Sequence, residues 1–246
     1  MARTFALSCL LLLVAGAWPA RAQPGFAGWA AIVVAGDYHS HSGAPSEVFD
    51  NARRDVSAGF ERLGVDPGNL EQFSVRPNHY RNAHLQHSDA QSIADALWDL
   101  SDRTRAGCLV YMSSHGTPGG MVLGDEILRP KQLEAMLNNS CADRPTVVII
   151  SACFSGVFVP ELRGPNRFVL TAARRDRTSF GCGDNDRYPF FDDCVLESLP
   201  RSNGFPSLAK ETEACVARKE AEANLSPPSD PQLSVGANVL SELPRW

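Results

Sequence analysis

Long hydrophobic segments are scarce in this 246-residue sequence. The longest nearly unbroken apolar run, at residues 5–17, is shorter than the roughly 20 residues that a membrane-spanning helix needs. Arg3 precedes this run, and Ala20-Arg21-Ala22 follows it in the A-x-A pattern of a signal-peptide cleavage site. We therefore interpret residues 1–22 as a signal peptide and expect an exported protein, periplasmic or extracellular, with no membrane span.

Basic residues are also few: the sequence has 23 Lys and Arg against 28 Asp and Glu. Removal of residues 1–22 takes away Arg3 and Arg21 but no acid, so the formal net charge moves from −5 to −7. Because phosphate binding depends on clustered Lys and Arg, we expect no nucleic-acid partner. Internal repeats are absent, and the only biased tract is a Pro- and Ser-rich linker at 226–231. Residues 23–246 therefore fit a single domain of ordinary size.

Cysteines are numerous enough for disulfides in an oxidising compartment, although a chain of this length does not need them as its framework. Of the seven, Cys9 lies in the apolar run of the signal peptide, and Cys108 lies in a later apolar run, where we expect a buried, unpaired residue. Cys153 is a candidate for chemistry. The remaining cysteines could form up to two bridges, whose pairing the sequence leaves open: Cys141, Cys182, Cys194 and Cys215.

Apolar runs of strand length alternate with helical patterns along the chain. The continuous runs, typical of strands covered on both faces as in parallel sheets, are 29–35, 108–112 and 146–150. Weaker strand candidates are 70–75, 167–172 and 232–235, with a hairpin arm at 121–123. Helices are predicted at 45–63, at 88–100 with Ser88 and Gln91 as a capping box, and at 130–137, 190–199 and 205–222. This order predicts an α/β fold, a three-layer α-β-α sandwich with a mostly parallel central sheet.

A histidine and a cysteine follow two of the expected strands. The run at 108–112 leads into His115-Gly116, and the run at 146–150 leads into Cys153. The carboxyl ends of parallel strands share one edge of a sheet, where chemistry collects. A thiolate attacks acyl carbons, and an imidazole can remove its proton and return one to the leaving group. The N–H groups of Gly116 and Cys153 could form an oxyanion hole.

Other interpretations stay open for these residues. Taken separately, Cys153 is compatible with a buried cysteine at a strand end, and His115 with a loop histidine. A non-catalytic, metal-binding exported protein is a second class of answer. Its ligands would come from two groups that match no closed four-ligand site: Asp37, His39 and His41, and His79, His84 and His87.

Three segments together resemble the legumain family of cysteine peptidases, which includes asparaginyl endopeptidases and lipid-anchor transamidases. These segments are Ser114-His115-Gly116, Ala152 to Gly156, and the stretch from Thr171 through Cys182. The resemblance covers roughly residues 29–199 and implies a caspase-like fold with Cys153 as nucleophile and His115 as acid-base residue. It implies no metal or cofactor, and a peptide or protein substrate. The expected function is an exported cysteine endopeptidase with an acyl-enzyme intermediate; the alternatives are a transpeptidase or transamidase, and an inactive, binding relative.

The resemblance also points to substrate-pocket positions, two of which depart from the family. Ser151 stands in place of an acid, and Asn51 stands in place of an arginine, whereas Thr178-Ser179 and Asp193 match the family pattern. Cleavage after asparagine therefore does not follow from the resemblance.

A polar residue after the first strand orients the histidine in this family. Asp37 and Tyr38 are the candidates here, and a carboxylate favours Asp37. Three arginines could supply a pocket cation or form a solvated basic loop: Arg174, Arg175 and Arg177.

Overall fold

The computed structural model describes residues 25–81 and 83–246. The expected signal peptide lies outside these residues. In the described part of the chain, no helix is long and apolar enough to cross a membrane.

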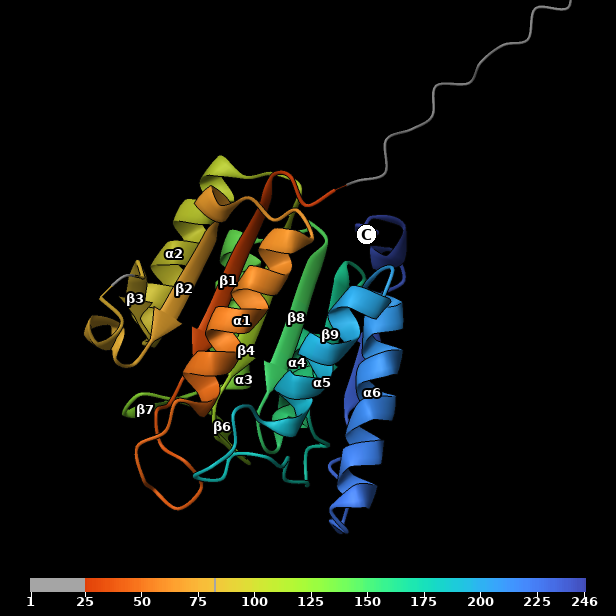
Figure 1. Ribbon diagram of the computed structural model, residues 1–246. Coiled ribbons are helices and arrows are strands. Elements are labelled where there is room, and N and C mark those ends of the chain that lie inside the picture. The colour runs from red at the N-terminus through yellow and green to blue at the C-terminus, as the bar shows by residue number, and fades with distance from the viewer. Residues whose placement is uncertain (1–24, 82) are drawn as a thin grey trace, which may run out of the picture.

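Within these residues a seven-stranded central sheet has the order β10-β9-β8-β4-β1-β2-β3 (Figure 1). All neighbouring strands are parallel except β10 and β9, which pair antiparallel. The strands are β1 (Trp29–Ala35), β2 (Leu70–Ser74), β3 (Leu85–His87), β4 (Gly107–Ser113), β8 (Thr146–Ser151), β9 (Arg167–Thr171) and β10 (Gln232–Val235). The continuous apolar runs are the central strands β1, β4 and β8, because these are buried on both faces.

Helices cover both faces of this sheet. Ala31 and Val33 of β1 belong to a core shared with α1 (Val48–Arg62), α5 (Phe190–Ser198) and α6 (Phe205–Glu222). Ile32 and Val34 point to the opposite core, shared with α2 (Ala90–Arg103), α3 (Pro130–Ser140) and α4 (Val159–Leu162). Short 3-10 turns occupy Pro67–Asn69, Pro77–His79, Ser155–Phe158, Leu199–Arg201 and Val239–Ser241. The predicted three-layer α-β-α sandwich is confirmed.

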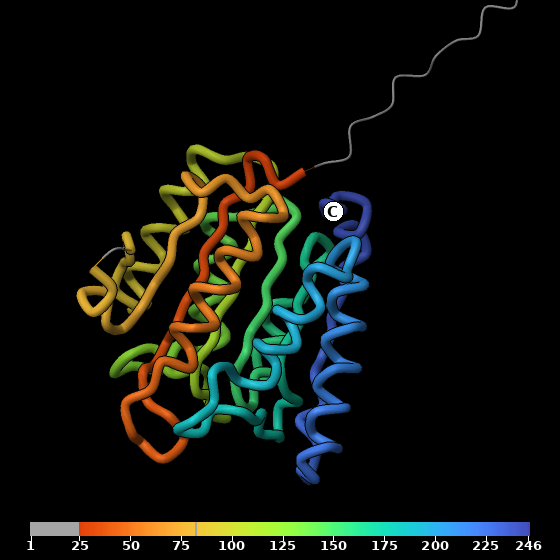
Figure 2. The backbone as a smooth tube through the Cα atoms, in the orientation of Figure 1, coloured from red at the N-terminus to blue at the C-terminus, as the bar shows by residue number. Residues whose placement is uncertain are grey.

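A small antiparallel sheet stands at the carboxyl edge of the central sheet. It has the order β5-β6-β7 and contains β5 (Gly116–Thr117), β6 (Gly120–Leu123) and β7 (Glu126–Leu128). The loops at 36–47 and 173–189 lie at the same edge (Figure 2). They are joined there by a hydrogen bond of 2.7 Å from the N–H of His41 to the carbonyl of Cys182.

The start of α2 differs from the prediction by one residue. Asp89 is the N-cap and accepts a hydrogen bond of 2.8 Å from the N–H of Ser92. Ser88 is instead buried and donates to the carbonyl of Ala35, 2.7 Å away. The predicted Ser88–Gln91 capping box was therefore wrong, because the hydroxyl of Ser88 is bonded to β1 and Asp89 accepts the N–H of the first turn instead.

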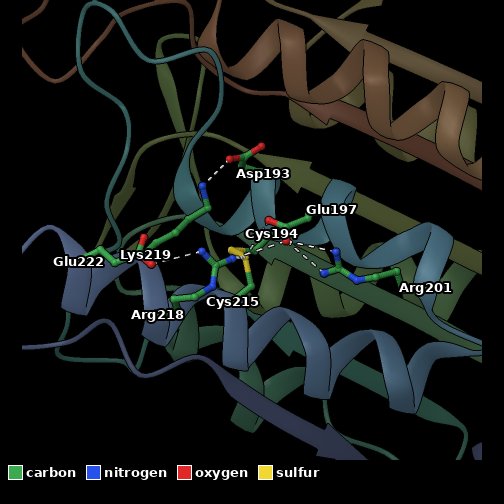
Figure 3. The surroundings of a disulfide bond; sticks show 8 residues. All are labelled: Asp193, Cys194, Glu197, Arg201, Cys215, Arg218, Lys219 and Glu222. Carbon is green, nitrogen blue, oxygen red and sulfur yellow. Dashed lines mark hydrogen bonds and ion pairs between the residues drawn. A yellow bond between two sulfur atoms is a disulfide. The ribbon is translucent and has the colours of Figure 1, made fainter.

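Two disulfides join four of the six described cysteines. Cys108 of β4 is bonded to Cys141 at the end of α3, and Cys194 of α5 to Cys215 of α6 (Figure 3). The prediction that Cys108 is unpaired was therefore wrong, because its side chain points to the face that α3 covers. Cys153 and Cys182 are the free cysteines of the described residues.

Candidate active site

Two polar loops leave the carboxyl edge of the central sheet from neighbouring strands. β4 ends at Ser113 and leads into His115, while β8 ends at Ser151 and leads into Cys153. Ser113 and Ser151 are register partners. The N–H of Ser114 donates to the carbonyl of Ser151 over 3.0 Å. The two loops therefore begin side by side.

Gly116 lies directly against the backbone of Cys153. A Cβ atom added at Gly116 would stand 1.9 Å from the carbonyl oxygen of Cys153 and 3.0 Å from its nitrogen. Only glycine permits so close an approach. The carbonyl of His115 also accepts a hydrogen bond of 2.9 Å from the N–H of Val122 in β6. The small sheet therefore holds the His115-Gly116 segment against the turn that carries Cys153.

The turn after Cys153 has an unusual backbone. Phe154 has φ 58° and ψ 11°, in the left-handed region, which costs a non-glycine residue roughly 1–2 kcal/mol. Its N–H donates to the carbonyl of Arg177 over 2.7 Å. Across residues 25–81 and 83–246, the N–H of Cys153 itself finds no acceptor. This N–H is available to a substrate oxygen.

His115 is fixed by a carbonyl and an aromatic ring. Its Nε2 lies 3.1 Å from the carbonyl oxygen of His39. Because a carbonyl only accepts, this bond keeps a proton on Nε2 and leaves Nδ1 as the nitrogen that can exchange a proton. The ring of Phe49 meets the imidazole edge to face, with 5.0 Å between centroids.

Asp37 acts on the loop at 37–39 and not on the imidazole of His115. Its carboxylate accepts from the N–H of Tyr38 (2.6 Å), from the N–H of His39 (3.1 Å) and from Nδ1 of His39 (2.8 Å). The predicted direct contact from Asp37 to His115 is therefore corrected: the carbonyl of His39 occupies that place. Tyr38, the other candidate, stacks on the ring of His39 at 3.9 Å.

The thiol of Cys153 faces Ser179. The N–H of Ser179 donates to Sγ over 3.3 Å, and the hydroxyl of Ser179 lies 3.6 Å from Sγ. The second free cysteine, Cys182, differs: burial, with a smaller effect of nearby Cys153, raises the pKa of its thiol to about 11.

Residues 78–210, which contain both His115 and Cys153, match the model of the peptidase C13 family. The chain belongs to the peptidase C13 family. It is thus a legumain-type cysteine peptidase. The crystal structure of caspase-1 from Spodoptera frugiperda is similar with a TM-score of 0.61, at 13% identity and over 87% of each chain, so the fold is caspase-like. No curated protein sequence matches the chain.

In this peptidase Ser151 belongs to a buried polar cluster beneath the site. Its hydroxyl donates to Asp192 of α5 over 2.6 Å, beside Ser113 (2.9 Å) and the hydroxyl of Tyr111 (2.5 Å). Burial raises the pKa of Asp192 to about 6, although the three hydroxyl donors act in the opposite direction. An acid thus lies under the sheet edge, contributed by α5.

The acid that the sequence indicated, Asp193, points elsewhere. Its carboxylate binds Lys219 of α6 at 2.6 Å, close to the Cys194–Cys215 disulfide (Figure 3). Asp193 thus pairs with α6, whereas its neighbour Asp192 is the acid that contacts Ser151. The signal for Asp192 was its place on the buried stripe of α5 beside Phe191 and Val195.

The other predicted pocket residues have different neighbours. Asn51 donates to the carbonyl of Arg187 over 3.2 Å, so it ties α1 to the loop at 173–189. Thr178 is exposed next to Ser179. Of the predicted pocket set, Ser179 is the residue that contacts the thiol of Cys153.

The histidine groups that suggested a metal site do not assemble one. In the part of the chain that the structure describes, no group of three or more His, Cys, Asp or Glu side chains could hold a metal ion. His39 pairs with Asp37, His87 with Asp89 at 3.2 Å, and His79 lies 3.6 Å from Glu47.

Proposed function

We propose that this peptidase hydrolyses peptide bonds through a Cys153–His115 dyad and an acyl-enzyme intermediate. The observation that carries the proposal is the contact of Gly116 with the backbone of Cys153. This contact joins the loops after β4 and β8 at one point of the sheet edge. A histidine next to a cysteine in that setting can exchange the thiol proton.

In the first half of the reaction the Cys153 thiolate attacks the carbonyl carbon of the scissile bond. The new C–S bond places negative charge on the substrate oxygen, which the N–H groups of Cys153 and Gly116 stabilise. His115 then gives a proton to the leaving nitrogen, the C–N bond breaks, and the amine product departs. A thioester remains on Cys153.

In the second half, His115 takes a proton from a water molecule that attacks the thioester carbon. The tetrahedral intermediate collapses with cleavage of the C–S bond, which releases the acid product and restores the thiol–imidazole pair. The carbonyl of His39 holds Nε2 throughout, so the same nitrogen, Nδ1, serves both halves.

Cleavage of a peptide library by purified protein tests this mechanism. The wild type should cleave, whereas Cys153→Ala should be inactive and His115→Ala should lose at least about 100-fold in kcat/KM. Equal cleavage by all three proteins would refute the dyad. An added amine nucleophile distinguishes the alternatives, because a transpeptidase would yield a ligated peptide of higher mass.

Export is the second part of the proposal. Support comes from the two disulfides, Cys108–Cys141 and Cys194–Cys215, since such bonds persist in oxidising compartments. The N-terminal sequence of the protein recovered outside the cytoplasm should begin near Gln23. Recovery of the intact chain only from the cytoplasm would contradict export.

A further inference from the structure

The loop after β9 contains arginines with unequal partners. Arg174 is neutralised, because its Nε lies 2.6 Å from Asp176 and its Nη1 lies 3.4 Å from Asp230. Arg175 is exposed, and among the described residues no carboxylate lies within 4.0 Å of it. The loop thus keeps an unbalanced positive charge on a chain whose formal net charge is −5.

This charge borders a surface hollow of about 640 Å³. Arg174 and Asp176 of its lining neutralise each other, which leaves the charge of Arg175. The wall of the hollow is partly apolar. An apolar wall lowers the local dielectric constant and so strengthens the attraction between Arg175 and an anion. The lining residues are Gly156, Val159, Pro160, Arg174, Arg175, Asp176 and Gln232.

The hollow adjoins the catalytic turn. Gly156 is the third residue after Cys153, and three residues span at most about 11 Å. A Cβ atom at Gly156 would stand 2.6 Å from the backbone nitrogen of Arg175. The N–H of Gly156 also donates to the carbonyl of Ala173 over 2.8 Å. A peptide held at Cys153 would therefore reach the hollow within a few residues.

A neighbouring hollow of about 310 Å³ has a different charge balance. It contains Arg174 and Arg177, but three carboxylates face them: Glu213, Glu220 and Asp230. An anionic side chain would meet repulsion there. The hollow beside Arg175 is the better site for an anion.

We propose that the hollow beside Arg175 is a substrate subsite for an acidic side chain, Asp or Glu, within about three residues of the scissile bond. The inference rests on the proposed function and adds a substrate class to it. A guanidinium group matches a carboxylate with two parallel hydrogen bonds. Arg175 can offer both, because no carboxylate of the described chain occupies it.

The test uses quenched fluorescent peptides with a fixed residue at the scissile bond and Asp, Ala or Lys at each of three positions on either side. At one position the wild type should prefer Asp over Ala by about 2- to 5-fold in kcat/KM. Arg175→Gln should abolish this preference, so that the Asp and Ala peptides are cleaved with similar kcat/KM. Arg175→Glu should reverse it in favour of Lys.

Arg62→Gln is the matched control. Arg62 is also exposed, and among the described residues it has no carboxylate partner, but it lies in the last turn of α1, at the opposite edge of the sheet (Figure 1). This variant should keep the full preference. A wild type that cleaves without acidic preference at any position, or a preference that survives Arg175→Gln, would overturn the subsite and leave the proposed function intact. A wild type that cleaves no peptide would overturn both.

Discussion

Replacement of Gly116 by alanine adds one methyl group at the contact between the two catalytic loops. The new Cβ would lie 1.9 Å from the carbonyl oxygen of Cys153, and real Cβ contacts essentially never fall below 3.0 Å. The loops must therefore separate by at least about 1 Å, and a misplacement of that size costs about 100-fold in rate. We expect Gly116→Ala to lower kcat/KM by about 100-fold or more, and overpacking to cost about 1–3 kcal/mol of stability.

The assay is steady-state cleavage of a fluorogenic peptide, together with urea unfolding of each variant. Gly119→Ala is the control, because a Cβ at Gly119 meets nothing closer than the hydroxyl of Thr117 at 3.6 Å. Gly119→Ala should retain the wild-type rate. A folded Gly116→Ala variant with the wild-type kcat/KM would refute the claim that Gly116 holds His115 against Cys153.

Three other predictions follow from the site and its supports. Because the folded-state pKa of Asp192, about 6, exceeds the ordinary value of 3.8, the folded chain binds the extra proton between these values. The free energy of unfolding of the wild type should therefore fall by about 2 kcal/mol relative to Asp192→Asn as the pH rises from 4 to 7, measured by urea unfolding. Parallel pH curves would contradict this. Asp37→Ala should lower kcat about tenfold with little change in KM, because the carbonyl of His39 loses its support. Asp37→Asn keeps an acceptor oxygen and should retain most of kcat. Equal losses in both variants would contradict a positioning role for Asp37. Removal of the Cys194–Cys215 disulfide, which closes a separation of 21 residues, should lower the free energy of unfolding by about 3 kcal/mol. The kcat of the folded enzyme at 25 °C should stay unchanged. A loss of kcat in the folded variant would contradict this separation of the disulfide from the site.

The sequence predicts the parts of the fold that depend on local pattern. The fully buried strands β1, β4 and β8 are continuous apolar runs, so their burial can be recognised from the sequence. By contrast, β3 has three residues, none of them buried, and leaves no apolar signal. The short α4 is similar, because four residues are too few for a periodic pattern.

Features that depend on spatial neighbours were harder to predict. Cys108 could be placed in a strand, but its pairing with Cys141 depends on where α3 packs. Gly116 was expected from the sequence to offer an N–H to the oxyanion, whereas its requirement for glycine depends on the backbone of Cys153, which lies against it only in the folded chain. Whether Asp192 or Asp193 faces the sheet depends on how α5 is rotated about its axis. The family pattern does not fix this rotation to within one residue.

The most direct test of the central claim is to identify the cysteine that a peptidyl electrophile labels. The purified protein is incubated with a peptidyl acyloxymethyl ketone at pH 7, and the modified residue is located by tandem mass spectrometry. Cys153 should be labelled, more slowly in His115→Ala. Cys182 should remain unlabelled, because the pKa of its thiol is raised to about 11. Labelling of Cys182 with Cys153 unmodified, or peptide cleavage by Cys153→Ala, would contradict the account.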